Sequence, residues 1–220
     1  MRRRIKDIVF FFYSLVRRDV RPKIVFYHDV GQKWTAMGTP REIFWRQMKM
    51  LRTDDRVCFD DGFRGVWDER DGFADRKIRP TLFVAPRLVG QKGYLTWDEL
   101  RILSADFGFS IQSHTWSHQT LVGSMIDESP SEERTEEWYR RELAESREKI
   151  AREVGCDVTE LCFPVGYYND ALISRCRAAG YQKVYTCIPA NRTEGFVQGR
   201  CLVQDIGVLA FGLFFAAGCK

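Results

Sequence analysis

The chain has 220 residues, of which 45% are hydrophobic and 29% are charged. This length suits one domain of moderate size with a substantial core, and the composition excludes a disordered or fibrous protein. The formal net charge of +4 is too small to indicate a nucleic-acid partner, and we expect none.

The first part of the chain is strongly basic. Before residue 24 there are eight basic and two acidic residues, and the apolar run IVFFFYSLV at 8–16 lies among them. Nine residues are too few for a spanning helix, which needs about 20. The run has the length of a signal-peptide core, but Arg17 and Arg18 follow it in place of a cleavage site of small residues. We expect residues 1–21 to form a helix that packs on the main domain, 22–220, or makes peripheral contact with a membrane.

The seven cysteines do not indicate a disulfide framework. Their number is odd, no two are spaced as C-x-x-C, and several lie in apolar runs where a free cysteine behaves as a small hydrophobe. This usage favours a reducing compartment, and we expect a cytoplasmic protein or one at the cytoplasmic surface of a bacterial membrane.

Short β-rich runs alternate with helical patterns along the chain. The predicted strands lie within 23–28, 56–61, 80–85, 109–114, 160–166, 183–187 and 200–205. The predicted helices cover 41–51, 131–154 with a stop at Gly155, and 169–181 with Asn169 or Asp170 as the cap and Gly180 as the stop. The apolar end, 208–220, is expected to form a last helix docked on the domain. Alternating strands and helices predict an α/β fold with a parallel sheet, either open or closed into a barrel.

Polar residues that can bind a metal follow several of these strands. All three histidines, His28, His114 and His118, lie at or just after a predicted strand, and the pair Asp60 and Asp61 ends another. Parallel α/β folds carry their chemistry at the carboxyl ends of the strands, so these side chains are expected on one face of the domain.

The spacing of His114 and His118 suits a metal site. An i, i+4 pair on a helical turn has both imidazoles on one side, and two imidazoles with one carboxylate form a common three-ligand set. Asp60 or Asp61 can supply the carboxylate, while the other aspartate stays close as a base for a water whose pKa the metal lowers. Taken singly, a DDG sequence is more often only a turn, and an H-x-x-x-H pair is more often a coincidence; their shared position at strand ends favours function.

Three motifs together resemble a known family. VCFDDGFRG at 57–65, SHTWSH at 113–118 and CFPVGYYN at 162–169 are similar, in this order, to the leading motifs of the NodB-homology polysaccharide deacetylases, carbohydrate esterase family 4. IVFYHDV near the start is most similar to the branch of poly-N-acetylglucosamine deacetylases. The resemblance covers about residues 22 to 205.

The resemblance implies a distorted (β/α) barrel of about seven parallel strands and a hydrolase that removes an N- or O-acetyl group from a sugar of a glycan or glycolipid. It implies a divalent metal, with zinc favoured, and an N-acetylated sugar or glycan as the substrate. By position, Asp61, His114 and His118 are the metal ligands, Asp60 is the general base, His28 is the general acid and the amide of Val165 binds the oxyanion. Tyr167, Trp116 and Pro164 are candidate substrate-binding residues.

Two departures from the family pattern bear on the site. Many members have an arginine at the position of Cys162, where it pairs with the base. Without it, we expect either a higher pKa of Asp60 or another residue, such as Arg64, in its place. The segment between Leu51 and Val57 is short, which suggests a trimmed loop near the site. Two rival functions remain open: hydrolysis of a non-sugar amide on the same fold, and glycan binding without catalysis, which only the missing arginine favours.

Overall fold

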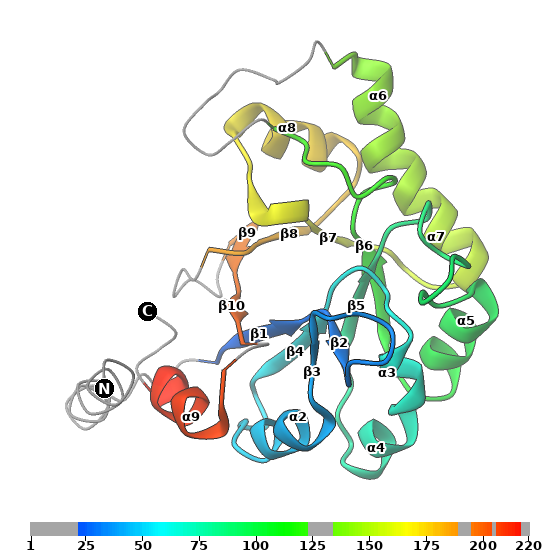
Figure 1. Ribbon diagram of the computed structural model, residues 1–220. Coiled ribbons are helices and arrows are strands. Elements are labelled where there is room, and N and C mark those ends of the chain that lie inside the picture. Colours follow the sequence, from blue (N-terminus) through cyan, green and yellow to red (C-terminus); the bar gives the residue numbers. More distant parts are fainter. Residues whose placement is uncertain (1–21, 123–133, 189–194, 204–205, 217–220) are drawn as a thin grey trace.

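The computed structural model describes residues 22–122, 134–188, 195–203 and 206–216 (Figure 1). The predicted N-terminal helix at 1–21, and with it the predicted membrane contact, lies outside these residues. In the described parts of the chain, no helix is long and apolar enough to cross a membrane.

Eight parallel strands form the central sheet. Their order is β10 (Cys201–Leu202), β1 (Ile24–Tyr27), β4 (Arg56–Phe59), β5 (Thr81–Val84), β6 (Ser110–Ser113), β7 (Glu160–Cys162), β8 (Lys183–Thr186) and β9 (Val197–Gly199). Each of the seven predicted runs contributes a strand, and β9 is an eighth that the sequence pattern did not predict. The predicted barrel of parallel strands is thereby confirmed.

One short segment joins the two edges of this sheet. β9 pairs with β8, β10 pairs with β1, and only Arg200 lies between β9 and β10. The segment therefore bends from one edge strand to the other and nearly closes the barrel, as Figure 1 shows at the left of the ring of strands.

Helices surround the barrel on the outside. They are α2 (Arg41–Met48), α3 (Gly65–Asp68), α4 (Arg70–Asp75), α5 (Trp97–Ala105), α6 (Glu136–Arg140), a π-helix (Arg141–Glu145), α7 (Ser146–Val154), a 3-10 turn (Pro164–Gly166), α8 (Asp170–Ala178) and α9 (Val208–Ala216). A small second sheet pairs β2 (Asp29–Val30) with β3 (Gly38–Thr39).

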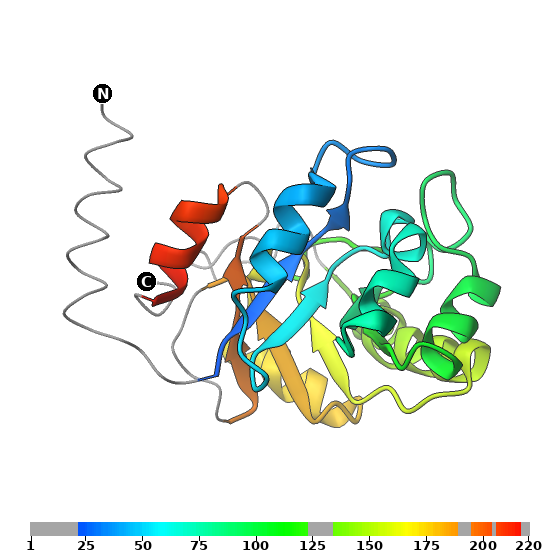
Figure 2. The same cartoon turned by 90° about the horizontal axis from the view of Figure 1, so that it is seen from below.

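The predicted helix ends agree with the structure. Gly155 ends α7 in the left-handed conformation, with φ of 76°, and Asn169 rather than Asp170 caps α8 by accepting a hydrogen bond from the amide of Leu172. The last helix, α9, packs against α2, and a Cβ at Gly212 would lie 2.5 Å from Cε of Met50. Figure 2 shows these two helices side by side. Gly212 thus allows α9 to approach the domain closely.

Alternating strand residues divide the core into two parts. One set faces the helices, and the other fills the barrel with Ile24, Phe26, Cys58, Phe83, Cys162 and Tyr185. Because side chains alternate along a strand, the inward set on β4 runs from Arg56 through Cys58 and continues to Asp60 just beyond the strand. The barrel interior is therefore a packed core that leads up to the strand ends.

The cysteines are in mixed states. Cys58, Cys156, Cys162, Cys176 and Cys187 are free, as the sequence led us to expect. Cys201 is disulfide-bonded, which the number and spacing of the cysteines did not indicate.

Candidate active site

Asp60 lies at the carboxyl end of β4, where its carboxylate binds a buried arginine. Nη1 and Nη2 of Arg200 each lie 2.7 Å from one oxygen of Asp60, in a two-pronged ion pair. Both side chains are almost fully buried. Burial opposes ionisation of Asp60, but the charge and hydrogen bonds of Arg200 more than offset it, so the pKa of Asp60 is lowered. Asp60 is thus held as a carboxylate.

Aromatic rings hold the guanidinium of Arg200 in the barrel. Its central carbon lies 4.1 Å from the ring centre of Phe26 and 5.4 Å from that of Phe83. Nη2 also lies 2.8 Å from Sγ of Cys162, the position at which the family pattern has its arginine. Arg200 therefore supplies, from the junction of β9 and β10, the cation that is missing from β7.

Arg64, the substitute expected from the sequence, has a different role. Its Nη2 lies 2.6 Å from Oε1 of Glu99 on α5. Another residue does take the place of the missing arginine, but it is Arg200, because Arg64 pairs with Glu99 outside the barrel. The alternative of a raised pKa of Asp60 is wrong, since that pKa is lowered.

The three predicted metal ligands meet beside Asp60. Oδ1 of Asp61 lies 2.9 Å from Nε2 of His118 and 3.4 Å from Nε2 of His114. The candidate ligand atoms of the three residues all lie within 4.8 Å of one another. Oδ1 of Asp61 is buried and makes no hydrogen bond of good geometry, although both nitrogens are close. A buried carboxylate oxygen without a hydrogen bond, facing two imidazole nitrogens, fits a shared divalent cation.

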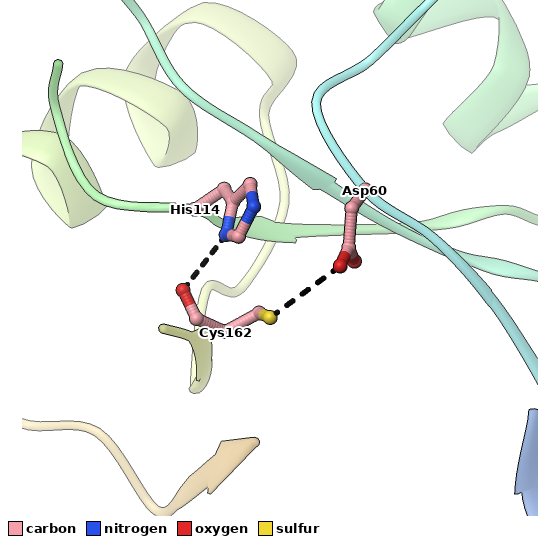
Figure 3. Close-up of side chains that lie close together, drawn as sticks. All are labelled: Asp60, His114 and Cys162. Carbon is pink, nitrogen blue, oxygen red and sulfur yellow. Dashed lines mark hydrogen bonds between the residues drawn. The ribbon is translucent and has the colours of Figure 1, made fainter. Parts of the chain in front are cut away.

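The orientation of His114 supports the same set. Its Nδ1 lies 2.8 Å from the carbonyl oxygen of Cys162, which can only accept, so Nδ1 carries the proton and Nε2 is free to bind a metal (Figure 3). This carbonyl therefore fixes the imidazole of His114 in the orientation that a metal ligand needs.

A second group, Asp60, His114 and Cys162, is also close enough to hold a metal. Figure 3 shows these three side chains facing one another. Asp60 is already paired with Arg200 through both oxygens. Burial raises the pKa of the Cys162 thiol well above its usual value, so it stays protonated. The set with Asp61 and His118 is therefore the better metal site.

Unusual backbone conformations bring these ligands together. Asp61, Thr115 and His118 all have φ between 62° and 68°, a region that residues other than glycine rarely adopt. After β4 the positive φ of Asp61 redirects the chain, so the two neighbouring aspartates reach different partners. Such conformations cluster at functional sites.

The loop with the two histidines is not helical. Residues 114–118 form a bend, so the predicted helical turn is wrong, although the two imidazole rings do meet with centres 4.8 Å apart. Glu142 holds this bend, because its Oε2 accepts hydrogen bonds from the amides of Trp116 and Ser117. Glu142 is buried and lies on the π-helix, where the wider turn interrupts the helical pattern that the sequence suggested.

His28 follows β1, the neighbour of β4. Tyr27 pairs with Phe59, so the next residues along the two strands are His28 and Asp60, and the charge of His28 contributes to the low pKa of Asp60. His28 is half-buried, which leaves it accessible to a substrate. The structure thus brings the predicted acid and the predicted base to one end of the barrel.

Asp29, the next residue, lies beside the end of the first motif. It is fully buried, and burial raises its pKa to about 7. A Cβ at Gly65 would lie 2.4 Å from its Oδ1, so only glycine fits at the end of the VCFDDGFRG motif.

Val165 lies in a strained turn after β7. It has φ of 64° and is 56% exposed, which is costly for a β-branched residue. Gly166 anchors the turn: its carbonyl accepts a hydrogen bond from Oγ1 of Thr186, and a Cβ there would lie 2.5 Å from the amide nitrogen of Cys187. The neighbouring strand β8 therefore holds this turn in its unusual conformation.

The predicted substrate-binding residues differ in exposure. Pro164 is buried, whereas Trp116 and Tyr167 are half-buried. The guanidinium of Arg141 lies 5.5 Å from the ring centre of Trp116. In the sequence, Trp116 lies between His114 and His118, two of the candidate metal ligands.

Comparisons with known proteins agree with this site. The sequence profile of the family "Polysaccharide deacetylase" matches residues 56–184. This range includes Asp60, Asp61, His114, His118 and Val165, but not His28 or Arg200. The chain belongs to the polysaccharide deacetylase family.

Relatives in this family differ in length from the chain. The provisionally assigned polysaccharide deacetylase YxkH of Bacillus subtilis is 28% identical over 180 residues, which are 76% of this chain and 60% of that protein. The chain therefore spans less than two thirds of the length of this relative.

Solved structures of low sequence identity share the fold. A polysaccharide deacetylase of Bacillus cereus is 20% identical, with a TM-score of 0.71 over 90% of this chain and 68% of its own. IcaB of Ammonifex degensii is 19% identical, with a TM-score of 0.71 over 87% and 96%. The deacetylase PplD of Streptococcus pyogenes, in complex with acetate, is 15% identical, with a TM-score of 0.71 over 90% and 98%.

Cys162 occupies the position at which many family members have an arginine, and Arg200 compensates for the missing cation. The cation that pairs with the base comes from position 200, outside the matched residues 56–184. The absence of arginine at 162 therefore does not leave the polysaccharide deacetylase site without a charge partner for Asp60.

Proposed function

We propose that this protein is a metal-dependent deacetylase that removes an acetyl group, attached through nitrogen, from a sugar of a glycan or glycolipid. One observation carries the proposal: a buried aspartate fixed by Arg200 lies next to an Asp–His–His set suited to a divalent cation. A cation on Asp61, His114 and His118 would polarise the acetyl carbonyl and make a water more acidic. Zinc suits this combination of nitrogen and oxygen ligands.

The chain's own residues supply the remaining chemistry. Asp60, which Arg200 keeps ionised, accepts the proton of the attacking water. The amide of Val165 binds the oxygen on which negative charge develops, and such a donor contributes on the order of 10²–10³ in rate. His28, next to Asp60, gives a proton to the departing nitrogen of the sugar.

The two rival functions have less support. Glycan binding without catalysis was favoured by the missing arginine alone, and Arg200 removes that reason. Hydrolysis of a non-sugar amide would use the same residues, so the substrate profile separates it from deacetylation: acetate release from chito-oligosaccharides against ring opening of small cyclic amides.

The test compares metal content and acetate release in matched variants. We expect about one bound zinc in the wild type. His114→Ala and Asp61→Ala should lose both metal and activity, while Asp60→Asn should keep the metal and lose activity. Asp106→Asn, an exposed site of equal charge change, is the control and should resemble the wild type.

Two results would refute the proposal. Full turnover in Asp60→Asn would show that Asp60 is not the base. No bound metal in the wild type, even after reconstitution with zinc, would show that the ligand set does not hold one and would favour glycan binding without catalysis.

A further inference from the structure

The amino end of the barrel has a basic hollow that the deacetylase site does not use. It encloses about 790 Å³ and lies around the loop between α2 and β4 and the loop after α4. Its cationic lining residues are Lys49, Arg52, Arg56, Arg76, Lys77 and Arg79. We call this the basic hollow. The short segment at 51–57 lines it, so the expectation that this segment lies near the catalytic site is wrong.

Several of these cations have no acidic partner. Lys49, Lys77 and Arg79 are exposed and make no ion pair or side-chain hydrogen bond with any residue that the structure describes. Arg76 lies over the ring of Trp45, 4.4 Å from its centre, and within the described part of the chain its side chain donates only to the carbonyl of Gly72. The hollow therefore has positive charge available to an anionic ligand.

The other charges of the basic hollow are already engaged. Arg56 pairs with Glu160 inside the barrel, and Arg52 pairs with Asp54. The one acidic lining residue, Asp55, accepts hydrogen bonds from the amides of Lys23 and Arg52. The hollow thus has four exposed cations that no carboxylate of the described residues neutralises, namely Lys49, Arg76, Lys77 and Arg79. Its one carboxylate, that of Asp55, accepts hydrogen bonds from backbone amides instead.

Phosphate is the anion that suits these groups best. Lysine and arginine donate several charge-assisted hydrogen bonds to phosphate oxygens. The volume is much larger than one free phosphate needs, so it leaves room for the organic part of a phosphodiester headgroup.

The chain that lines the basic hollow also leads to exposed apolar side chains. Met50, next to Lys49 in the chain, is 41% exposed, and its Cε approaches Gly212 of α9. Helix α9 has the sequence VLAFGLFFA, without a charge, and Leu209 on it is 70% exposed. Exposed cations beside exposed apolar side chains are typical of proteins that lie on anionic membranes.

We infer that the basic hollow binds the phosphate groups of anionic phospholipids and holds the protein on a membrane surface. β4 begins at the hollow with Arg56 and ends at Phe59, just before Asp60. In Figure 2, the tail of the cyan arrow, which is β4, marks the end of the barrel that would face the lipid. The catalytic residues would then lie at the opposite end of the barrel, away from the membrane. This inference goes beyond the proposed function and does not depend on it.

The test measures sedimentation of the full chain with vesicles of phosphatidylcholine, with and without phosphatidylglycerol. The combined variant Lys49→Gln, Lys77→Gln and Arg79→Gln removes three exposed cations from the hollow. The control Lys92→Gln, Arg152→Gln and Lys183→Gln makes the same charge change at exposed positions elsewhere. We expect the hollow variant to bind anionic vesicles at least about tenfold more weakly than the wild type, and the control to bind almost normally.

Three outcomes would overturn the inference. Equal binding by the hollow variant and the wild type would assign vesicle binding to another part of the chain, such as residues 1–21. An equal loss in the control would show a general effect of net charge. If inorganic phosphate alone stabilises the wild type but not the hollow variant, and no vesicle binding occurs, the hollow takes a soluble phosphate compound.

Acetate release from soluble chito-oligosaccharides separates this inference from the proposed function. The hollow variant should retain wild-type release, because its three substitutions lie outside the catalytic end of the barrel. Loss of vesicle binding with retained release would support the inference, whatever the natural substrate is.

Discussion

The barrel interior has an arginine–carboxylate pair at each end, and the two pairs have different surroundings. At the amino end, Nη2 of Arg56 lies 2.5 Å from Oε2 of Glu160, and the side chains are 29% and 13% exposed. At the carboxyl end, the side chains of Arg200 and Asp60 are 0% and 3% exposed. The side chains of the first pair are partly exposed to solvent, whereas those of the second are almost fully buried.

The hydrogen-bond partners differ as well. Arg56 also donates to the hydroxyl oxygens of Thr81 and Tyr185, so its guanidinium ties together three strands besides its own. Arg200 binds Asp60 through two nitrogens and otherwise contacts sulfur atoms and aromatic rings. The amino-end pair therefore joins strands, whereas the carboxyl-end pair sets the charge of one catalytic group.

The largest effect is expected from Arg200→Ala. It leaves Asp60 buried without its cation, and breaking one partner of a buried pair costs about 3–5 kcal/mol of unfolding free energy. We expect kcat/KM at neutral pH to fall at least about 10²-fold, because Asp60 loses both its position and its ionisation. Urea unfolding and acetate release measure the two effects. Arg200→Lys keeps the charge without the two-pronged geometry and should be intermediate; wild-type activity in Arg200→Ala would contradict the assigned role.

The pH dependence of Arg200→Ala should shift in a defined direction. Arg200 lowers the pKa of Asp60, and without it burial raises that pKa. Activity requires ionised Asp60, so the acid limb of the pH–rate profile should move to higher pH in the variant. In the wild type, the lowered pKa contributes stability above the unfolded value of about 3.9 that is lost at lower pH. In the variant, the raised pKa has the opposite effect, so the difference in unfolding free energy should widen as pH rises through about 4. An unshifted acid limb would exclude Asp60 as the titrating base.

A relocated arginine should recover part of the lost activity. Cys162 contacts Nη2 of Arg200, so an arginine at 162 can direct its guanidinium into the space that Arg200→Ala vacates. We expect the double variant Cys162→Arg, Arg200→Ala to release acetate about tenfold faster than Arg200→Ala alone. The single variant Cys162→Arg, with two guanidinium groups beside one carboxylate, is the control and should unfold more easily than the wild type. No recovery would show that the position of the cation, as well as its presence, is fixed.

Arg56→Met should affect stability but not catalysis. It removes the cation from Glu160 at the partly exposed amino end, where an unpaired group costs about 1–3 kcal/mol. The thermal midpoint should fall, and kcat/KM, measured below that midpoint, should stay within about threefold of the wild type. A large loss of activity in the folded variant would show that the two ends of the barrel are coupled.

The smallest effect is expected from Cys162→Ala. Its thiol is protonated and makes only weak sulfur hydrogen bonds, accepting from Nη2 of Arg200 and donating to Oδ2 of Asp60 at 3.8 Å. We therefore expect a loss of about 1 kcal/mol in unfolding free energy and little change in rate. The same two measurements apply. A shift of the acid limb in this variant would mean that the sulfur, and not Arg200 alone, sets the pKa of Asp60.

The carboxyl-end site was predictable where its signals are local. Asp60, Asp61, His114 and His118 lie in short motifs directly after β-rich runs, and the alternation of strands with helices predicts that these ends meet. In the structure Asp61, His114 and His118 do lie close together, and the family match at 56–184 covers all four positions.

Arg200 was not predictable in the same way. It is 140 residues from Asp60 in the chain, and the sequence shows it only as the first residue of the predicted strand at 200–205, with no motif around it. Its burial depends on how β9 and β10 close the barrel, which no local pattern reports. The role of Glu142 could not be predicted for a related reason. Glu142 lies on the π-helix and accepts hydrogen bonds from the amides of Trp116 and Ser117, and a regular helical pattern does not indicate this position.

The bend between β9 and β10 has a practical consequence for drawing the limits of this domain. A fragment ending at Val184, where the family match stops, would contain every recognised motif. It would also have an unpaired outer edge on β1 and on β8, and its base would lack a counter-ion. The last stretch to Leu202 therefore belongs to the smallest unit in which the motifs can work, although it contains none of them.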